Sequence, residues 1–304
     1  MAVQIDLKGI RVGLLGGDRR ELVVADLLAA RGAQVRAVGL PWPDPVSYTA
    51  NRLEDVASWA NVVIAPVGGT DEVGYIAYSI VPYAEFPGPR LTEDIVSCMR
   101  PGTLLVIGSA RPELTALCRR YDVRLVAYRD WDSFAILNAI PSAEGAVAMA
   151  MEESDITLHG SVTMVLGFGR LGTILANMLK GIGALTVVVA RDVVDLTKAR
   201  ALGHRSVDFG LLHAALPDAD IVFNTVPALV LPEAQLERMR RDAVVIDVAT
   251  APGGTDFAAA RRLGLKARLA PGLPGLVAPR TAGQIEAETV LRILRDELGL
   301  RAAG

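Results

Sequence analysis

Two stretches of the chain, about 150 residues apart, open in the same way. Each has an apolar, β-branched run, a glycine turn, a helical pattern and a second apolar run. The first stretch starts at Lys8 and its second run is Gln34–Gly39; the other starts at His159 and its second run is Leu185–Ala190. A strand, a crossover helix and a strand form a βαβ unit with parallel strands. Two such units predict an α/β fold of two doubly wound, Rossmann-like parallel-sheet domains.

Short apolar runs bounded by turn residues indicate the other buried strands. They are Asn61–Ala65, Thr103–Ile107, Val123–Ala127, Val162–Leu166, Ile221–Asn224, Ala243–Val248 and Lys266–Ala270. Helical patterns fall between them at Arg19–Ala30, Thr92–Met99, Pro112–Arg120, Arg170–Lys180, Leu196–Leu202, Pro232–Met239 and Asp256–Leu263. Strands and helices therefore alternate through both halves, as a parallel sheet requires.

The same patterns predict the domain boundaries. Residues 1–140 form a flavodoxin- or Rossmann-like substrate domain, and 141–156 a connecting helix with a hinge near Asn138–Ser142. Residues 157–280 form the second Rossmann domain. Residues 281–304 form a C-terminal helix that starts at the capping box Thr281-x-x-Gln284 and ends at Gly299. We expect this helix to pack back on the first domain.

Composition excludes several classes of protein. The net charge is −3 and no basic block occurs, so we expect neither nucleic acid nor an anionic membrane as a partner. Two cysteines, Cys98 and Cys118, do not make a disulfide framework and suit a reducing cytoplasm. The start of the chain does not resemble a signal peptide, no apolar run reaches the length of a membrane span, and no metal-ligand cluster is present.

The second domain opens with the most specific motif, Gly167-Phe168-Gly169-Arg170-Leu171-Gly172. Its strand and helix context is the one that a dinucleotide-binding G-x-G-x-x-G requires. Gly167 permits the tight turn, Gly169 lets a diphosphate approach the backbone, and Gly172 lets helix and strand pack closely. The helix amides then face the phosphates. The motif therefore predicts a nicotinamide dinucleotide site.

The residue after the second strand of this domain distinguishes an NAD site from an NADP site. An NAD site usually has an acidic residue there for the ribose hydroxyl. Here Arg191 precedes Asp192. A guanidinium matches a phosphate bidentately, so Arg191 favours the 2′-phosphate of NADP. The alternative is that Arg191 faces solvent and Asp192 binds the ribose.

Three later turns fall at the same sheet edge, where ligands of open sheets bind. The first, Asn224-Thr225-Val226-Pro227, should run beside the cofactor, as should Ala249 after the next strand. The amides of Gly253, Gly254 and Thr255 are candidates for substrate binding. The third turn is Ala270–Gly275. The alternative is that the glycine-rich segments are only tight turns.

The positions of the histidines argue against the mechanism of a 2-hydroxy-acid dehydrogenase. A 2-hydroxy-acid dehydrogenase uses a histidine as its acid–base group. The chain has His159, His204 and His213, and none follows in the late loops. No Gly-x-Ser-x-Gly elbow occurs either. A reaction with an aromatic product needs a strong base less than it needs correct placement of the C–H bond.

Several long stretches together resemble the A subunits of dipicolinate synthase from endospore-forming bacteria. They are Leu15–Arg19, Asn138–Gly145, Leu166–Arg170, Asn224–Pro227, Ala251–Phe257 and Ala270–Gly283. The resemblance covers nearly the whole chain. It implies an NADP-dependent oxidoreductase that oxidises dihydrodipicolinate to dipicolinate with a flavoprotein-like B subunit. It also implies a role in sporulation, in the mother-cell cytoplasm.

A dicarboxylate substrate needs cations or donors. Candidates are Arg280, the hinge residues Asn138 and Ser142, and the three amides named above; Glu144 and Asp256 are candidate proton acceptors. The family often has Lys at the position of Arg280.

Two other functions stay open from the residues alone. One is an alanine-dehydrogenase-like NAD(P)-dependent dehydrogenase of an amino or hydroxy acid. The other is a non-catalytic, NADP-binding regulatory subunit. A homodimer is also compatible with the sequence.

Overall fold

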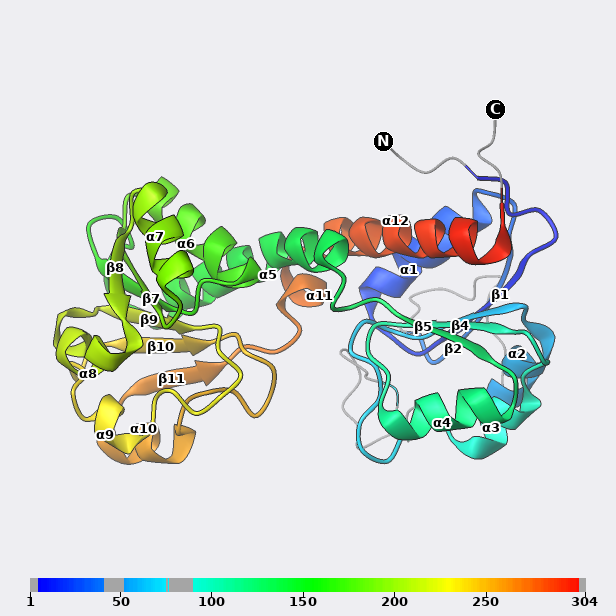
Figure 1. The fold of residues 1–304 in the computed structure, drawn as a ribbon, viewed down its shortest axis with the longest axis horizontal. Coiled ribbons are helices and arrows are strands. Elements are labelled where there is room, and N and C mark those ends of the chain that lie inside the picture. The colour runs from blue at the N-terminus through cyan, green and yellow to red at the C-terminus, as the bar shows by residue number, and fades with distance from the viewer. Residues whose placement is uncertain (1–4, 41–51, 75, 77–89, 301–304) are drawn as a thin grey trace. The chain divides into compact units, whose positions relative to one another are not determined.

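The computed structural model describes residues 5–40, 52–74, 76 and 90–300 of the 304-residue chain (Figure 1). The chain divides into two compact units, each held together by its own internal contacts. The first comprises Met1–Phe134 together with Ala278–Gly304, and the second comprises Ala135–Val277. Each unit contains one parallel sheet, which confirms the predicted two-sheet α/β architecture.

The first sheet has the strand order β2-β1-β3-β4-β5 and all its strands are parallel. The strands are β1 (Arg11–Leu15), β2 (Gln34–Val38), β3 (Val62–Ile64), β4 (Leu104–Ile107) and β5 (Arg124–Ala127). Each corresponds to a predicted apolar run. The order reverses between β1 and β3, as in flavodoxin-like sheets.

Helices cover both faces of this sheet. They are α1 (Arg19–Ala29), α2 (Leu53–Trp59), α3 (Glu93–Cys98), α4 (Pro112–Arg120) and α12 (Pro279–Leu298). α1 and α12 pack on one face and share a core with Leu14 and Ile64. α2, α3 and α4 pack on the other, around Val63 and Leu105. Cys118 lies in that second core, where burial raises the pKa of its thiol to about 11.

The second sheet has the order β11-β10-β9-β6-β7-β8 and is also parallel. Its strands are β6 (Val162–Leu166), β7 (Leu185–Ala190), β8 (Arg205–Asp208), β9 (Ile221–Asn224), β10 (Val244–Asp247) and β11 (Lys266–Leu269). This is the Rossmann order, with the reversal between β6 and β9. β8 has no counterpart among the predictions, because an edge strand reading Arg-Ser-Val-Asp lacks an apolar run.

Helices also cover both faces of the second sheet. They are α6 (Arg170–Ile182), α7 (Val193–Ala201), α8 (Leu212–Ala215), α9 (Glu233–Leu236), α10 (Phe257–Leu263) and α11 (Leu273–Val277), with 3₁₀ turns η1 (Phe209–Leu211) and η2 (Leu216–Asp218). α6 and α7 share a core with the long helix α5 (Asp132–Glu153). α8, α9 and α10 share a core on the opposite face.

The connecting helix is longer than predicted. We expected it to begin at Pro141 after a hinge, but α5 runs unbroken from Asp132 to Glu153, and the two units divide after Phe134. Proline removes one backbone hydrogen bond but does not always end a helix. Ser142 Oγ donates to the carbonyl of Asn138 at 2.9 Å within the same turn. The segment that we interpreted as a hinge is therefore helical.

α5 is also long and apolar enough to cross a membrane, judged by length and composition alone. Core helices of soluble proteins pass the same test. Here one face of α5, with Ala143, Ala146 and Ala150, is buried in the core of the second unit. That packing accounts for part of the apolar composition of α5, while Ile136, Leu137 and Met151 are exposed.

The tail helix α12 packs on the first unit, as predicted, and lies beside α1 (Figure 1). Gly283 permits this approach, because a Cβ there would lie 2.7 Å from the carbonyl oxygen of Arg20. Gly299 ends the helix in the left-handed conformation. The predicted capping box is wrong: Ala278 is the N-cap and Pro279 fills the first position, so Thr281 already lies within the helix.

Buried ionisable side chains tie α12 to α1 and to the end of β5. Tyr128 Oη donates to Glu286 Oε1 at 2.7 Å. Arg20 donates from Nη2 to Asp18 Oδ2 at 2.8 Å, and the backbone amide of Asp18 donates to Glu21 Oε2 at 2.6 Å. Glu21 and Glu286 are fully buried, and each has one carboxyl oxygen without a partner among the described residues.

Burial sets the protonation of this cluster. It raises the pKa of Glu286 to about 7, against the opposing charge of Arg20. Burial and then the charge of Glu286 raise the pKa of Glu21 well above its usual value. Both effects favour protonated carboxyl groups near neutral pH.

Candidate functional site

The glycine turn between β6 and α6 has the geometry that the motif predicts. Gly167 has a φ of +94° and its amide donates to the carbonyl of Val189 at 2.8 Å. A Cβ on Gly167 would lie 2.5 Å from Thr225 Oγ1. A Cβ on Gly172 would collide with the carbonyl oxygen of Gly167. Both glycines are therefore required by close packing within the protein.

Gly169 is different, because its missing side chain leaves open space. It is the N-cap of α6, is exposed, and a Cβ built there would meet no described atom within 4 Å. α6 has 13 residues and begins at Arg170, with no side chain capping its first amides. Amides that open a helix favour an anion. The turn thus fits a diphosphate, which supports the predicted role of Gly169.

Of the other three residues of the motif, Arg170 is exposed, and Phe168 and Leu171 contribute by packing. Phe168 is buried in the core that α5 and α6 share, and its ring lies 6.1 Å from the His204 ring, edge to face. Leu171 is half-buried against the same core. Their side chains anchor the turn, so only backbone groups of Phe168 and Leu171 are suited to a ligand.

We expect Gly172→Ala to destabilise the second unit by about 2 kcal/mol, because the added methyl group collides with the Gly167 carbonyl. Gly181→Ala, on the same helix, is the control. Its Cβ meets no described atom within 4 Å, so the substitution should be neutral or stabilise by up to about 0.5 kcal/mol. Thermal melts and amide exchange over residues 162–182 measure both; equal stability of the two variants would contradict the packing role.

The segment after β9 is held next to the glycine turn. Thr225 Oγ1 donates to the carbonyl of Leu166 at 2.8 Å. Asn224 is buried; its Nδ2 donates to the carbonyl of Val226, and its Oδ1 accepts from the amide of Val226, both at 3.0 Å. Pro227 is exposed. The structure therefore brings this segment and Gly167 together, while its expected place beside the cofactor stays a prediction.

The glycine-rich turn after β10 is engaged by a residue that the sequence did not single out. Asp247 accepts from the amides of Ala249 and Gly254, and Gly253 donates to the carbonyl of Thr250 at 3.0 Å. Thr255 is buried. The amides of Gly253 and Gly254 thus have partners inside the protein, so the expected donation from them to a substrate has no support here. A charged residue ending an apolar strand was the only available signal for Asp247.

Asp256 has a structural role. It is the N-cap of α10, and its Oδ1 accepts from the amide of Ala259 at 2.9 Å. The expected proton acceptor at this position therefore caps a helix. Glu144, the other candidate acceptor, is exposed on α5.

Arg191 is exposed and directly follows β7. Its neighbour Asp192 accepts from the amide of Val194 at 2.6 Å and caps α7. One oxygen of the Asp192 carboxylate thus accepts a hydrogen bond from the helix. Arg191 follows β7, whose Val189 pairs with Leu166 at the end of β6.

The remaining candidates lie on α5 and α12. Asn138 Oδ1 is buried without a partner among the described residues, and Ser142 is committed to its own helix. A Cβ on Gly145 would lie 3.0 Å from Leu273 Cβ, so the family-like α5 stretch contacts α11. Arg280 is exposed at the start of α12 and belongs to the first unit.

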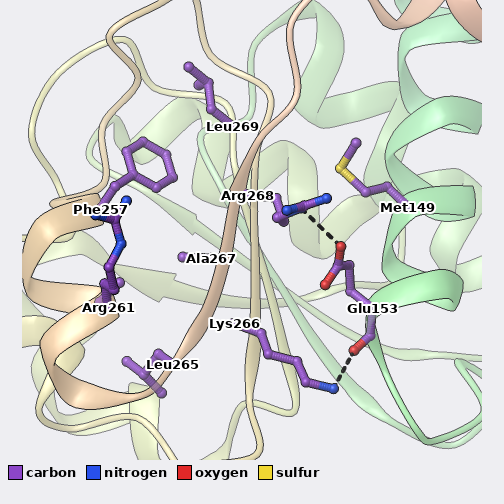
Figure 2. Close-up of a pocket in the computed structure, with 10 residues that line it drawn as sticks. Met149, Glu153, Phe257, Arg261, Leu265, Lys266, Ala267, Arg268 and Leu269 are labelled. Carbon is purple, nitrogen blue, oxygen red and sulfur yellow. Dashed lines mark hydrogen bonds and ion pairs between the residues drawn. The ribbon is translucent and has the colours of Figure 1, made fainter.

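A groove of about 570 Å³ lies elsewhere on the second unit, along the edge strand β11 between α5 and α10. Figure 2 shows that Arg268 and Lys266 both reach Glu153: Arg268 Nε lies 2.9 Å from its carboxylate, and Lys266 donates to its carbonyl at 3.0 Å. The groove contains none of the predicted site residues. Of its charged side chains, Arg268 forms an ion pair with Glu153. Charged residues are common on edge strands.

Metal chemistry has no support within the part of the chain that the structure describes, where no three His, Cys, Asp or Glu residues could hold an ion. His204 is buried, its Nε2 lies 3.1 Å from Asn177 Oδ1, and burial lowers its pKa. It therefore supports Phe168 and is not placed as an acid–base group.

Known families match both halves of the chain. Residues 11–129 match the N-terminal domain of the dipicolinate synthase A subunits. Residues 142–254 match the NAD-binding domain of the D-isomer-specific 2-hydroxyacid dehydrogenases. The second unit is thus a nicotinamide dinucleotide-binding domain of the dehydrogenase type, in agreement with the glycine turn.

Whole proteins agree with the domain matches. The dipicolinate synthase A subunit of Bacillus subtilis (strain 168) is 32% identical over 293 residues, which are 95% of this chain and 97% of that protein. The crystal structure of its Bacillus halodurans counterpart has a TM-score of 0.86 and 33% identity, covering 95% of this chain and 99% of that one. A Sinorhizobium meliloti transhydrogenase shares the fold alone, with a TM-score of 0.66 at 14% identity over 94% of each chain. The chain therefore belongs to the family of dipicolinate synthase A subunits.

Proposed function

We propose that the protein is the A subunit of an NADP-dependent dipicolinate synthase, which oxidises dihydrodipicolinate to dipicolinate with a flavoprotein-like B subunit. The observation that carries the proposal is the open space at Gly169, at the start of α6, in a chain of this family. From the family relationship we also propose a role in sporulation, in the mother-cell cytoplasm.

NADP is the proposed cofactor because a cation directly follows β7 and the carboxylate next to it caps a helix. Arg191 is exposed there, while Asp192 caps α7 at 2.6 Å. A guanidinium binds a phosphate bidentately, and a carboxylate in the same place would repel it.

A bound dinucleotide would supply the acceptor for a hydride from the substrate ring, and one proton would leave the ring in the same oxidation. The chain supplies placement: helix amides for the diphosphate and the Asn224–Pro227 segment for the nicotinamide half. Arg280 is the proposed cation for a substrate carboxylate, and Asn138 a proposed polar contact. Glu144, exposed on α5, is the proposed proton acceptor.

The test is production of dipicolinate and NADPH from dihydrodipicolinate, with the chain alone and with the B subunit. We expect turnover with NADP to exceed turnover with NAD at least about tenfold, and Arg191→Asp to remove or reverse that preference. Arg238→Asp, at another exposed arginine of the same unit, should leave the preference unchanged. Oxidation of amino or hydroxy acids instead, or activity of the B subunit without this chain, would overturn the proposal.

A further inference from the structure

We propose that Asp247 is a positioning residue of the dinucleotide site: its buried carboxylate locks the loops after β9 and β10 into one wall that receives the nicotinamide half of the cofactor. The inference rests on the proposed dinucleotide binding. Asp247 is 0% exposed, so we infer that it acts through the loops that it holds and does not touch the ligand itself.

The hydrogen bonds of Asp247 come from three different segments. Its Oδ1 accepts from Asn224 Nδ2 at 3.0 Å and from the amide of Ala249 at 3.1 Å. Its Oδ2 accepts from the amide of Gly254 at 2.8 Å and from Thr255 Oγ1 at 2.7 Å. One side chain thus joins the segment after β9, the start of the loop after β10, and the far end of that loop.

These four donors fill the hydrogen-bonding capacity of the side chain. A carboxylate has about four acceptor positions. Each Asp247 oxygen accepts two hydrogen bonds. Hydrogen bonds to an ionised acceptor are about twice as strong as neutral ones. The buried charge is therefore stabilised only while both loops keep their present conformation.

The constraint passes from Asp247 to the glycine turn through Asn224. The carboxylate fixes which end of the Asn224 amide faces it, and Asn224 then bonds both the amide and the carbonyl of Val226. The intervening residue, Thr225, donates to Leu166 and contacts Gly167. Asp247 is thus connected by direct contacts to the turn that cradles the diphosphate.

The two glycines after β10 have a clear purpose in this arrangement. Gly253 has a φ of +83°, and a Cβ on it would lie 2.9 Å from Asp247 Oδ2. A Cβ on Gly254 would lie 2.6 Å from both Asn224 Nδ2 and the carbonyl oxygen of Val226. Both glycines let the loop close on the carboxylate, which explains their presence without a direct substrate contact.

The strand order places this wall at the nicotinamide end. In a Rossmann sheet each half binds one nucleotide of the cofactor. β6, β7 and β8 form the half that carries Arg191, so β9, β10 and β11 form the other half. Asp247 ends β10 and Asn224 ends β9, side by side in the register.

The test compares two ligands on the full chain. Asp247→Asn puts an amide donor against at least one of the present donors, and we expect NADPH affinity to fall at least about tenfold in a fluorescence titration. 2′-Phospho-ADP-ribose keeps the diphosphate but lacks the nicotinamide ring, so its affinity should fall by a smaller factor than that of NADPH. Loss of general structure would weaken both ligands equally.

Two further variants make the result decisive. Asp220→Asn is the matched control, because Asp220 Oδ2 accepts from the amide of Val162 at 2.8 Å, at the opposite end of the sheet. It should leave NADPH affinity unchanged. Thr255→Val removes a single donor to Asp247. It should lower the affinity for NADPH by a smaller factor than Asp247→Asn does, and it remains informative if Asp247→Asn fails to fold.

Wild-type affinity for NADPH in both Thr255→Val and Asp247→Asn, or equal losses of affinity for both ligands, overturns the inference. Failure of the wild-type chain to bind either ligand overturns the proposed function instead.

Discussion

Gly169→Asp is expected to reduce dinucleotide affinity at least about 100-fold while leaving the second unit as stable as before, or slightly more stable. The position faces open space and caps α6 with no side chain, so an aspartate can be accommodated and is a better N-cap than glycine. The same carboxylate stands where the diphosphate should bind and repels it. Titration with NADPH and a thermal melt measure the two effects, which have opposite signs.

Gly181→Asp is the matched control for this experiment. Gly181 lies near the other end of α6, and a Cβ there also meets no described atom within 4 Å. The variant has the same composition and charge as Gly169→Asp. It should bind NADPH like the wild-type chain. Unimpaired binding by Gly169→Asp would show that the cofactor does not use the glycine turn.

The first unit is expected to lose stability as the pH rises, and Glu286→Gln to remove much of that loss. The folded state holds the proton of Glu286 more tightly than the unfolded chain, because burial raises the pKa from 4.5 to about 7. The contribution is fully present below about pH 4.5 and is lost as the pH rises through about 7. Each pKa unit is about 1.4 kcal/mol, so the loss amounts to about 3 kcal/mol.

Glutamine keeps an oxygen acceptor for Tyr128 and cannot ionise. Glu286→Gln should therefore unfold with about 2–3 kcal/mol more free energy than wild type at pH 8, and equally at pH 4.5. Urea unfolding followed by tryptophan fluorescence reports on this unit specifically, since Trp42, Trp59 and Trp131 all belong to it. Glu288→Gln, at an exposed position of the same helix, is the control. Wild-type and Glu286→Gln curves that coincide at pH 8 would rule the effect out.

The strands were the most predictable part of the fold. β6, β7 and β9 begin and end at the predicted residues, because each is an apolar run with glycine, proline or charged residues nearby. The failures have physical causes. Half-polar β8 gains its place by pairing with β7, and the α5 segment keeps its helix through Pro141. In both segments, contacts with distant parts of the chain determine the secondary structure, and the local sequence does not.

In the candidate site, too, some residues were predictable from the sequence and others were not. A glycine needed for a turn leaves a local pattern, so the positions of Gly167, Gly169 and Gly172 were predictable. Three of the four partners of Asp247 come from positions 23 residues earlier and 7 and 8 residues later along the chain, and no local pattern encodes these three. Gly253 and Gly254 look the same in sequence whether they face a ligand or a neighbouring carboxylate; only the distances distinguish the two.

The return of α12 to the first unit has a consequence for the order in which the newly made chain can fold. Residues 135–277 leave the ribosome as one continuous segment and contain everything their own core requires. The first core includes Val290, Leu291 and Leu294, which are synthesised last. At roughly 5–20 residues per second, α1 waits about 10–50 s for the helix that covers it. During translation, the half that begins first is therefore the half that is completed last.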